Sequence, residues 1–269
     1  MPDLMGVINV TPDSFSDGGL YLDPGAAVAR GRELVAAGAA ILDVGGESTR
    51  PGADPVDVAV ERERVVPVIE RLRGSGARIS VDTSKAEVAA AALAAGAEIV
   101  NDVTALRAAP EIAGLCAHAG ATLILMHMRG NPRTMQDDPV YGDVVADVKS
   151  FLAERIERAV AGGVPEERVW IDPGIGFGKT LDHNLELVRR LSELAELGRP
   201  VVVGTSRKSF IAKIDGSGVE DRLGGTIASS ILAWRNGADV LRVHDVGEAA
   251  EGLRVASAIL APERTAHSG

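Results

Sequence analysis

The sequence predicts a single (β/α)8 barrel, and two features lead to that prediction. Four times, a helix-like stretch ends in Gly-Ala and is followed by a short apolar run that finishes on a polar residue; the glycines are Gly38, Gly96, Gly120 and Gly237. Glycine suits the left-handed position that closes a helix, and an apolar run suits a parallel strand buried on both faces. In addition, strand-like and helix-like stretches alternate eight times without a linker over 269 residues, a common size for a barrel.

The expected elements follow this alternation in chain order. Strands are expected at 5–9, 40–44, 78–82, a stretch ending at 101–102, a stretch ending at 127, 169–172, 201–203 and 240–243. Helices are expected at 24–37, 58–73, 86–95, 112–119, 144–161, 185–197, 222–235 and 248–260. Pro24 supports the first helix, because its missing N–H is not needed in a first turn. The loop at 11–19 is too long for a simple βα turn, and loops of that length are often functional.

The barrel is expected to span 1–261, followed by a loose polar tail at 262–269. A doubly wound open sheet is the alternative fold. That fold would more often carry a Gly-rich fingerprint after the first strand, where this chain has Thr-Pro-Asp.

Composition narrows the possible partners of the chain. A net charge of −10 argues against nucleic-acid binding and against binding to anionic membranes. Hydrophobic residues make up 46% of the chain and aromatic residues only 3%, so we expect an aliphatic core. Cys116 is the single cysteine and is expected to pack in a helix rather than react. With no apolar run near 18 residues and no signal-like start, a cytoplasmic enzyme is expected.

Polar residues gather at or just past the predicted strand ends, where a barrel keeps its active site. They are Asn9, Asp43, Asp82, Asn101, His127, Asp172, Lys208, Arg242 and His244. Asp43 and Asp102 are interpreted as capping residues, since aspartate is common at such positions. The role of Asp82 stays open, because the adjacent Thr83 and Ser84 could cap the next helix instead.

The expected rim has an acceptor-rich half and a cationic half. Asp82, Asn101 and Asp172 suit a flat heterocycle that carries amino and ring N–H groups, because a carboxylate facing such an edge makes two charge-assisted hydrogen bonds. The segment 206–209 follows strand seven and Arg242 ends strand eight, a place where barrels often bind phosphate. Two other interpretations remain: Arg207 could merely solvate the rim, and Lys208 could be a Schiff-base lysine.

The metal prediction is limited to Mg²⁺. The five histidines show no ligand spacing, so a zinc-type site is not expected. His118 is expected on a helix surface, and His183 is expected to cap helix six. Mg²⁺ held by few protein oxygens and a substrate phosphate is compatible with the sequence, with Asn9 as the protein ligand. The glycine-rich stretch 174–179 lacks P-loop spacing and is interpreted as an active-site loop.

Several stretches together resemble the dihydropteroate synthase family, a folate-pathway family that sulfonamides target. The matching stretches run in order along the whole chain, and the first two are very specific. They are 5–19, 43–52, 80–83, 101–103, 125–128, 172–179, 204–208 and 242–246. The resemblance implies that 6-hydroxymethyl-7,8-dihydropterin diphosphate and 4-aminobenzoate combine to give 7,8-dihydropteroate and diphosphate. It also implies a homodimer that uses Mg²⁺.

The resemblance further implies a role for each matching residue. The residues implied to hold the pterin are Asp82, Asn101, Asp172 and Lys208, and those implied to receive the diphosphate are Asn9, Thr49, Arg242 and His244. The residues implied to line the aminobenzoate site are Pro51, Phe177, Lys208 and Ser209. The residues implied to close loops one and two over the substrates are Phe15, Asp17, Ser48 and Arg50. The catalytic candidates are Asp172, Lys208, Asp17 and Arg50.

Three other functions stay open at this point. A pterin-binding methyltransferase of the methyltetrahydrofolate type would share the barrel and the pterin carboxylates. A non-catalytic pterin-binding paralogue would not need the closing loops. A phosphate-binding isomerase or aldolase would need a well-placed base and would not need the acceptor set.

Overall fold

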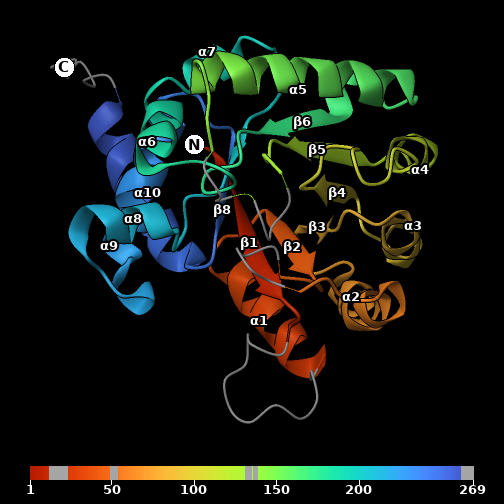
Figure 1. The fold of residues 1–269 in the computed structure, drawn as a ribbon. Helices are drawn as coiled ribbons and strands as arrows, with labels where there is room; N and C mark the ends of the chain where they lie inside the picture. Colours follow the sequence, from red (N-terminus) through yellow and green to blue (C-terminus); the bar gives the residue numbers. More distant parts are fainter. Residues whose placement is uncertain (12–23, 49–53, 131–134, 136–138, 262–269) are drawn as a thin grey trace, which may run out of the picture.

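The computed structural model describes residues 1–11, 24–48, 54–130, 135 and 139–261, and these form one eight-stranded parallel sheet surrounded by helices (Figure 1). The strands are β1 (Asp3–Asn9), β2 (Ile41–Gly45), β3 (Arg78–Asp82), β4 (Ile99–Asp102), β5 (Thr122–Met126), β6 (Val169–Asp172), β7 (Val202–Val203) and β8 (Val240–Val243). The strand order is β6-β5-β4-β3-β2-β1-β8-β7. The tail at 262–269 lies outside the described residues.

The two ends of this sheet meet, which closes the barrel. Ile171 of β6 forms a parallel bridge to Val201, directly before β7. The Ile171 N–H also donates to the Pro200 carbonyl at 3.0 Å. The predicted (β/α)8 barrel is therefore confirmed, and the open doubly wound alternative is wrong.

The helices follow the predicted order, except that the expected helix 185–197 is divided in two and one short helix, α8, is additional. They are α1 (Pro24–Ala36), α2 (Val58–Leu72), α3 (Ala86–Ala95), α4 (Ile112–Ala119), α5 (Val144–Ala161), α6 (Leu181–Arg189), α7 (Ser192–Ala195), α8 (Ser209–Asp215), α9 (Leu223–Arg235) and α10 (Val246–Leu260), with short 3₁₀ turns at Glu166–Arg168 and Val219–Asp221. The helix expected at 185–197 starts earlier, because Thr180 and His183 form a reciprocal capping box, and it breaks before α7. This confirms His183 as a capping residue.

Helix α8 was not predicted from the sequence. It has only seven residues, and Gly216 ends it in the left-handed region at φ 75°. So short an element leaves little hydrophobic periodicity to detect. The glycine pattern that predicted the barrel is confirmed: Gly38, Gly96, Gly120 and Gly237 all have positive φ, between 63° and 114°.

The barrel interior changes from apolar to polar along the strands. One interior layer consists of Met5, Ile41, Ile99, Ile124, Val202 and Val240. Since alternate residues of a strand face the same side, the residues two positions further on also face inward. On β2, β4 and β8 these are Asp43, Asn101 and Arg242. The carboxyl-terminal mouth of the barrel is therefore lined by charged and polar side chains above an aliphatic floor.

Candidate active site

Arg242 is the centre of the polar layer. Its Nε donates to Asp43 Oδ2 at 2.6 Å and its Nη2 donates to Asp82 Oδ2 at 2.8 Å. Asn101 Nδ2 donates to the same Asp43 oxygen at 3.2 Å. The interpretation of Asp43 as a capping residue is wrong, because strand periodicity turns this side chain into the barrel. Asp102, in contrast, caps the turn that follows β4 through the N–H groups of Thr104 and Leu106.

Burial dominates the electrostatics of this layer. It raises the pKa of Asp82 to about 7, with Arg242 opposing the shift and Asp43 adding to it. Burial also acts to lower the pKa of Arg242, but the two carboxylates outweigh it and the pKa rises. The guanidinium is thus a permanent cation, held between two carboxylates of which Asp82 titrates near neutral pH.

The contacts at the start of α3 decide the role of Asp82, which the sequence left open. Thr83 Oγ1 donates to Glu61 Oε1 at 2.7 Å, and α3 begins after Lys85 without a side-chain cap. Lys85 instead pairs with Glu47 and with the buried Glu61. Asp82 is therefore free of a capping role and faces Arg242.

Asp172 ends β6 and is buried. Its Oδ1 accepts from the Gly174 N–H at 2.6 Å. Burial raises the pKa of Asp172, while that hydrogen bond and the cations of Lys208 and Arg242 oppose the rise. Lys208 comes from the loop after β7, and its Nζ lies 4.0 Å from the centroid of the Phe177 ring. The loops after β6 and β7 therefore meet beside Asp172.

The loops after β7 and β8 are tied to one another. Ser206 Oγ lies 3.0 Å from His244 Nδ1 and accepts from the His244 N–H at 3.2 Å. Burial and the nearby cation of Arg242 lower the pKa of His244 to about 3, so its ring is neutral. Arg207 adopts a left-handed backbone at φ 57° and binds both oxygens of Asp245, at 3.0 and 2.6 Å. Arg207 therefore does not merely solvate the rim.

The remaining predicted residues fall into two groups. Asn9 is half-buried at the end of β1 beside Gly45, Ser48 is half-buried after β2, and Ser209 is exposed at the start of α8. The others lie outside the described residues: Phe15, Asp17, Thr49, Arg50 and Pro51. Within the described part of the chain, no group of three or more His, Cys, Asp or Glu residues could hold a metal ion. Asn9 as a Mg²⁺ ligand stays a prediction.

Sequence reasoning missed one buried cation of the site. Lys179 is 2% exposed, and its Nζ contacts two loop carbonyls and the ring of His127. Its position at the end of a glycine-rich loop was visible in the sequence, but no pattern indicated that the ammonium turns inward.

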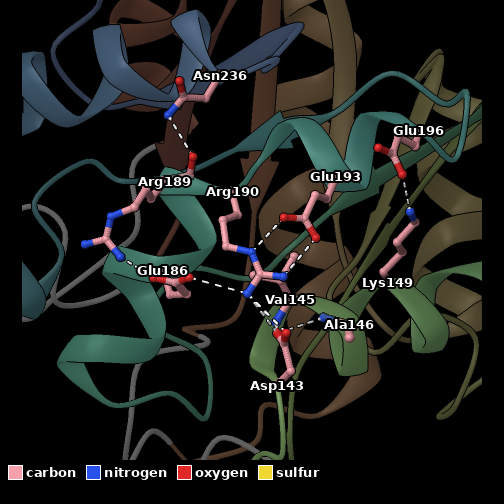
Figure 2. A network of polar contacts seen from close by, with 10 residues as sticks. All are labelled: Asp143, Val145, Ala146, Lys149, Glu186, Arg189, Arg190, Glu193, Glu196 and Asn236. Carbon is pink, nitrogen blue, oxygen red and sulfur yellow. Dashed lines mark hydrogen bonds and ion pairs between the residues drawn. The ribbon is translucent and has the colours of Figure 1, made fainter.

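A second polar network lies outside the barrel, between α5 and the α6–α7 segment (Figure 2). It surrounds Arg190 with Asp143, Glu186 and Glu193. A hollow of about 450 Å³ adjoins it and is lined by residues that include His183, Arg189 and Arg190. These charges satisfy one another on the surface, so the convergent polar groups at the strand ends remain the better candidate for an active site. Among the described residues, no helix is long and apolar enough to cross a membrane.

Known proteins resemble this chain in both sequence and structure. Residues 5–244 match the family model described as pterin binding enzyme. The dihydropteroate synthase of Escherichia coli strain K12 is 46% identical over 260 residues, which cover 96% of this chain and 92% of the relative. The dihydropteroate synthase of Xanthomonas albilineans, solved with 4-aminobenzoic acid, has a TM-score of 0.91 and 48% identity, covering 97% and 94% of the two chains. The same enzyme with 7,8-dihydropteroate has a TM-score of 0.88 and 45% identity, covering 97% and 95%.

Proposed function

This chain belongs to the pterin-binding enzyme family, among its dihydropteroate synthases, and we propose that its reaction takes place at the mouth of the barrel described above. The reaction joins 6-hydroxymethyl-7,8-dihydropterin diphosphate to 4-aminobenzoate and releases diphosphate, so the chain is a transferase. One observation carries the placement: Arg242 lies between two inward-facing carboxylates, in the same polar layer as Asn101.

The pterin is proposed to bind against the acceptor half of this layer. The residues that would hold it are Asp82, Asn101, Asp172 and Lys208. A buried carboxylate facing the amino and ring N–H groups of the pterin gains two charge-assisted hydrogen bonds, and an ionised Asp172 would also stabilise positive charge that spreads over the ring. This role needs buried acceptors with fixed directions, and Asp172 has one oxygen already fixed by the Gly174 N–H.

The diphosphate is proposed to leave toward the cationic half, at Arg242, His244 and Asn9. Cleavage of the C–O bond leaves negative charge on the departing oxygen, and the permanent cation of Arg242 stabilises that charge. The ring of His244 is neutral, so it can offer a hydrogen bond to the diphosphate without adding charge. Its contact with Ser206 fixes the orientation of the ring. Asn9 offers one neutral amide oxygen at a half-buried strand end, which fits a Mg²⁺ ion that takes its other ligands from diphosphate and water. When bound, Mg²⁺ supplies further neutralisation of the leaving group.

The aminobenzoate is proposed to lie along the Phe177 ring, with its carboxylate near Lys208 and Ser209. The ammonium of Lys208 already lies over that ring, so a flat aromatic acid can stack on Phe177 while its charge faces a cation. Its neutral amine would then form the C–N bond to the pterin carbon as the C–O bond to diphosphate breaks, and the proton lost from the nitrogen would pass to water or to the departing diphosphate. A closed site would keep water from competing for the same carbon.

We further propose that two copies of the chain associate in the cytoplasm. Large apolar side chains on the outer surface of α9 and α10 support the association of two copies: Leu232 is 56% exposed, Val255 57% and Ile259 76%. Gly252 of α10 packs directly on Ile227 of α9, so these helices form one surface. Light scattering after gel filtration should give twice the chain mass, and Val255→Glu with Ile259→Glu should give the mass of one chain.

The reaction is tested by diphosphate release from purified protein with Mg²⁺ and the pterin diphosphate, with 4-aminobenzoate present or omitted. Release that depends on aminobenzoate, with 7,8-dihydropteroate identified by mass, is expected. Absence of release, with pterin binding retained in calorimetry, would favour a binding-only paralogue or the methyltransferase.

A further inference from the structure

Lys179 is a buried lysine whose described hydrogen-bond partners are all neutral. Burial lowers the pKa of its ammonium to about 7, with the charge of Asp172 opposing that shift and the charge of Lys208 adding to it. The Nζ of Lys179 lies 2.9 Å from the Gly174 carbonyl, 2.9 Å from the Phe177 carbonyl and 3.0 Å from His127 Nδ1, with the His127 carbonyl at 3.4 Å. Burying a cation without a contacting carboxylate is costly, and a methionine would fill similar space without that cost. We therefore expect the role of Lys179 to lie in the N–H donors of its Nζ, which contact the loop carbonyls and His127.

The contacts of Lys179 define the state of His127. When Lys179 is protonated, its ammonium has three donors and no acceptor, so the His127 Nδ1 at 3.0 Å accepts from it. His127 is then neutral and carries its proton on Nε2. This agrees with the pKa of His127, which burial and the nearby cations lower to about 2. The His127 ring also makes an edge-on contact with the Phe151 ring, and the two ring centroids lie 4.9 Å apart.

The loop that Lys179 holds is pressed against the end of β5. Gly174 has φ 66°, and a Cβ atom there would lie 1.9 Å from the His127 carbonyl oxygen, so only glycine fits. The Phe177 N–H donates to the Gly174 carbonyl at 3.0 Å, which closes a turn. Lys179 binds the two carbonyls at the ends of that turn. The turn carries the Phe177 ring on one side, and the Gly174 N–H that fixes Asp172 on the other.

We propose that Lys179 is a positioning residue for the reaction, whose ammonium fastens the Gly174–Phe177 turn to His127 and so sets the Phe177 ring for the aromatic amine substrate and Asp172 for the pterin. The proposal rests on the function proposed above. Its strongest effect is expected on the aminobenzoate side, because Lys179 binds the carbonyl of Phe177 itself, whereas Asp172 remains anchored on β6.

The test compares Lys179→Met, which removes the donors at similar volume, with Lys213→Met, which alters an exposed lysine of α8. Lys179→Met is expected to raise the KM for aminobenzoate about tenfold or more, since misplacing a binding group by a fraction of an ångström costs on this scale. The dissociation constant of the pterin diphosphate should change much less, and Lys213→Met should match wild type. An unchanged KM in Lys179→Met, with only a lowered Tm, would overturn the proposal.

A double-mutant cycle with Phe177→Ala separates positioning from general destabilisation. If Lys179 acts through the Phe177 ring, Lys179→Met should add little to the KM of Phe177→Ala; fully additive effects would contradict the proposal. Should Lys179→Met fail to fold, Lys179→Gln retains two donors and should give an intermediate KM, whereas a wild-type KM would overturn the proposal. Wild-type protein that makes no dihydropteroate would instead contradict the proposed function.

Discussion

Two arginines of this chain are each surrounded by carboxylates, one in the mouth of the barrel and one on its outer surface. Arg242 binds Asp43 and Asp82, whose side chains are 0% and 9% exposed. Arg190 binds Asp143, Glu186 and Glu193, whose side chains are 33% to 46% exposed (Figure 2). The same pairing of residue types therefore occurs in two different environments.

The two environments shift the carboxyl groups in opposite directions. In the mouth, burial raises the pKa of Asp82 to about 7 even beside a guanidinium. On the surface, the hydrogen bond from Arg190 lowers the pKa of Glu193. Water still solvates the outer carboxylates, so contact with a cation stabilises their charged form without a large cost of desolvation. The inner carboxylates have lost their water, and their charge must be compensated by Arg242 or by a substrate.

The strongest test of this contrast is Arg242→Met. Removing the cation leaves Asp43 and Asp82 buried and uncompensated, which should lower the free energy of unfolding by about 3 kcal/mol or more. Diphosphate release should also fall far below wild type, because the leaving group loses its cation. Urea unfolding and the release assay measure the two effects. Wild-type stability would mean that these carboxylates are neutral or reach water without Arg242.

Asp172→Asn tests a further buried carboxylate of the barrel mouth. The amide keeps the shape but cannot make charge-assisted hydrogen bonds, so pterin binding should weaken by roughly 1.5–3 kcal/mol. Calorimetry with the pterin diphosphate measures this directly. Near-normal affinity would remove Asp172 from the proposed pterin site.

The pH dependence of stability distinguishes the two networks further. Because the pKa of Asp82 rises from 3.8 to about 7 on folding, the folded chain holds a proton that the unfolded chain releases between those pH values. The contribution of Asp82 to the free energy of unfolding therefore falls as pH rises through this window and is constant above it. Asp82→Asn should flatten that part of the curve. Curves of equal slope for wild type and variant, measured by urea unfolding from pH 4.5 to 8, would contradict the shift.

Arg190→Met provides the surface counterpart and the smallest expected effect. Its carboxylate partners remain hydrated when the guanidinium is removed, so stability should change much less than in Arg242→Met. Diphosphate release should stay at the wild-type rate. A loss of stability as large as that of Arg242→Met would show that exposure does not explain the difference between the two networks.

Much of the fold could be predicted because its signals are local. A left-handed glycine after a helix and an apolar run before a polar residue each involve a few neighbouring positions. This pattern occurs four times, and the alternation of strand-like and helix-like stretches predicted all eight strands. The short helix α8 and the break between α6 and α7 escaped prediction, since a few residues carry little periodicity. The candidate residues at strand ends were also predictable, because the carboxyl ends of parallel strands lie at one end of a barrel.

The sequence by itself determined which residues reach the mouth of the barrel, since chain order and strand period place them there. Only the tertiary structure decided their partners and their charge. Asp43 and Arg242 are 199 residues apart, and no local pattern turns Asp43 from a cap into the partner of a distant arginine. In the same way, nothing local in the sequence indicates that Lys179 is buried and that its Nζ contacts only neutral hydrogen-bond acceptors among the described residues. Burial and ion pairing depend on everything packed around a group, so they arise only when the whole barrel has closed.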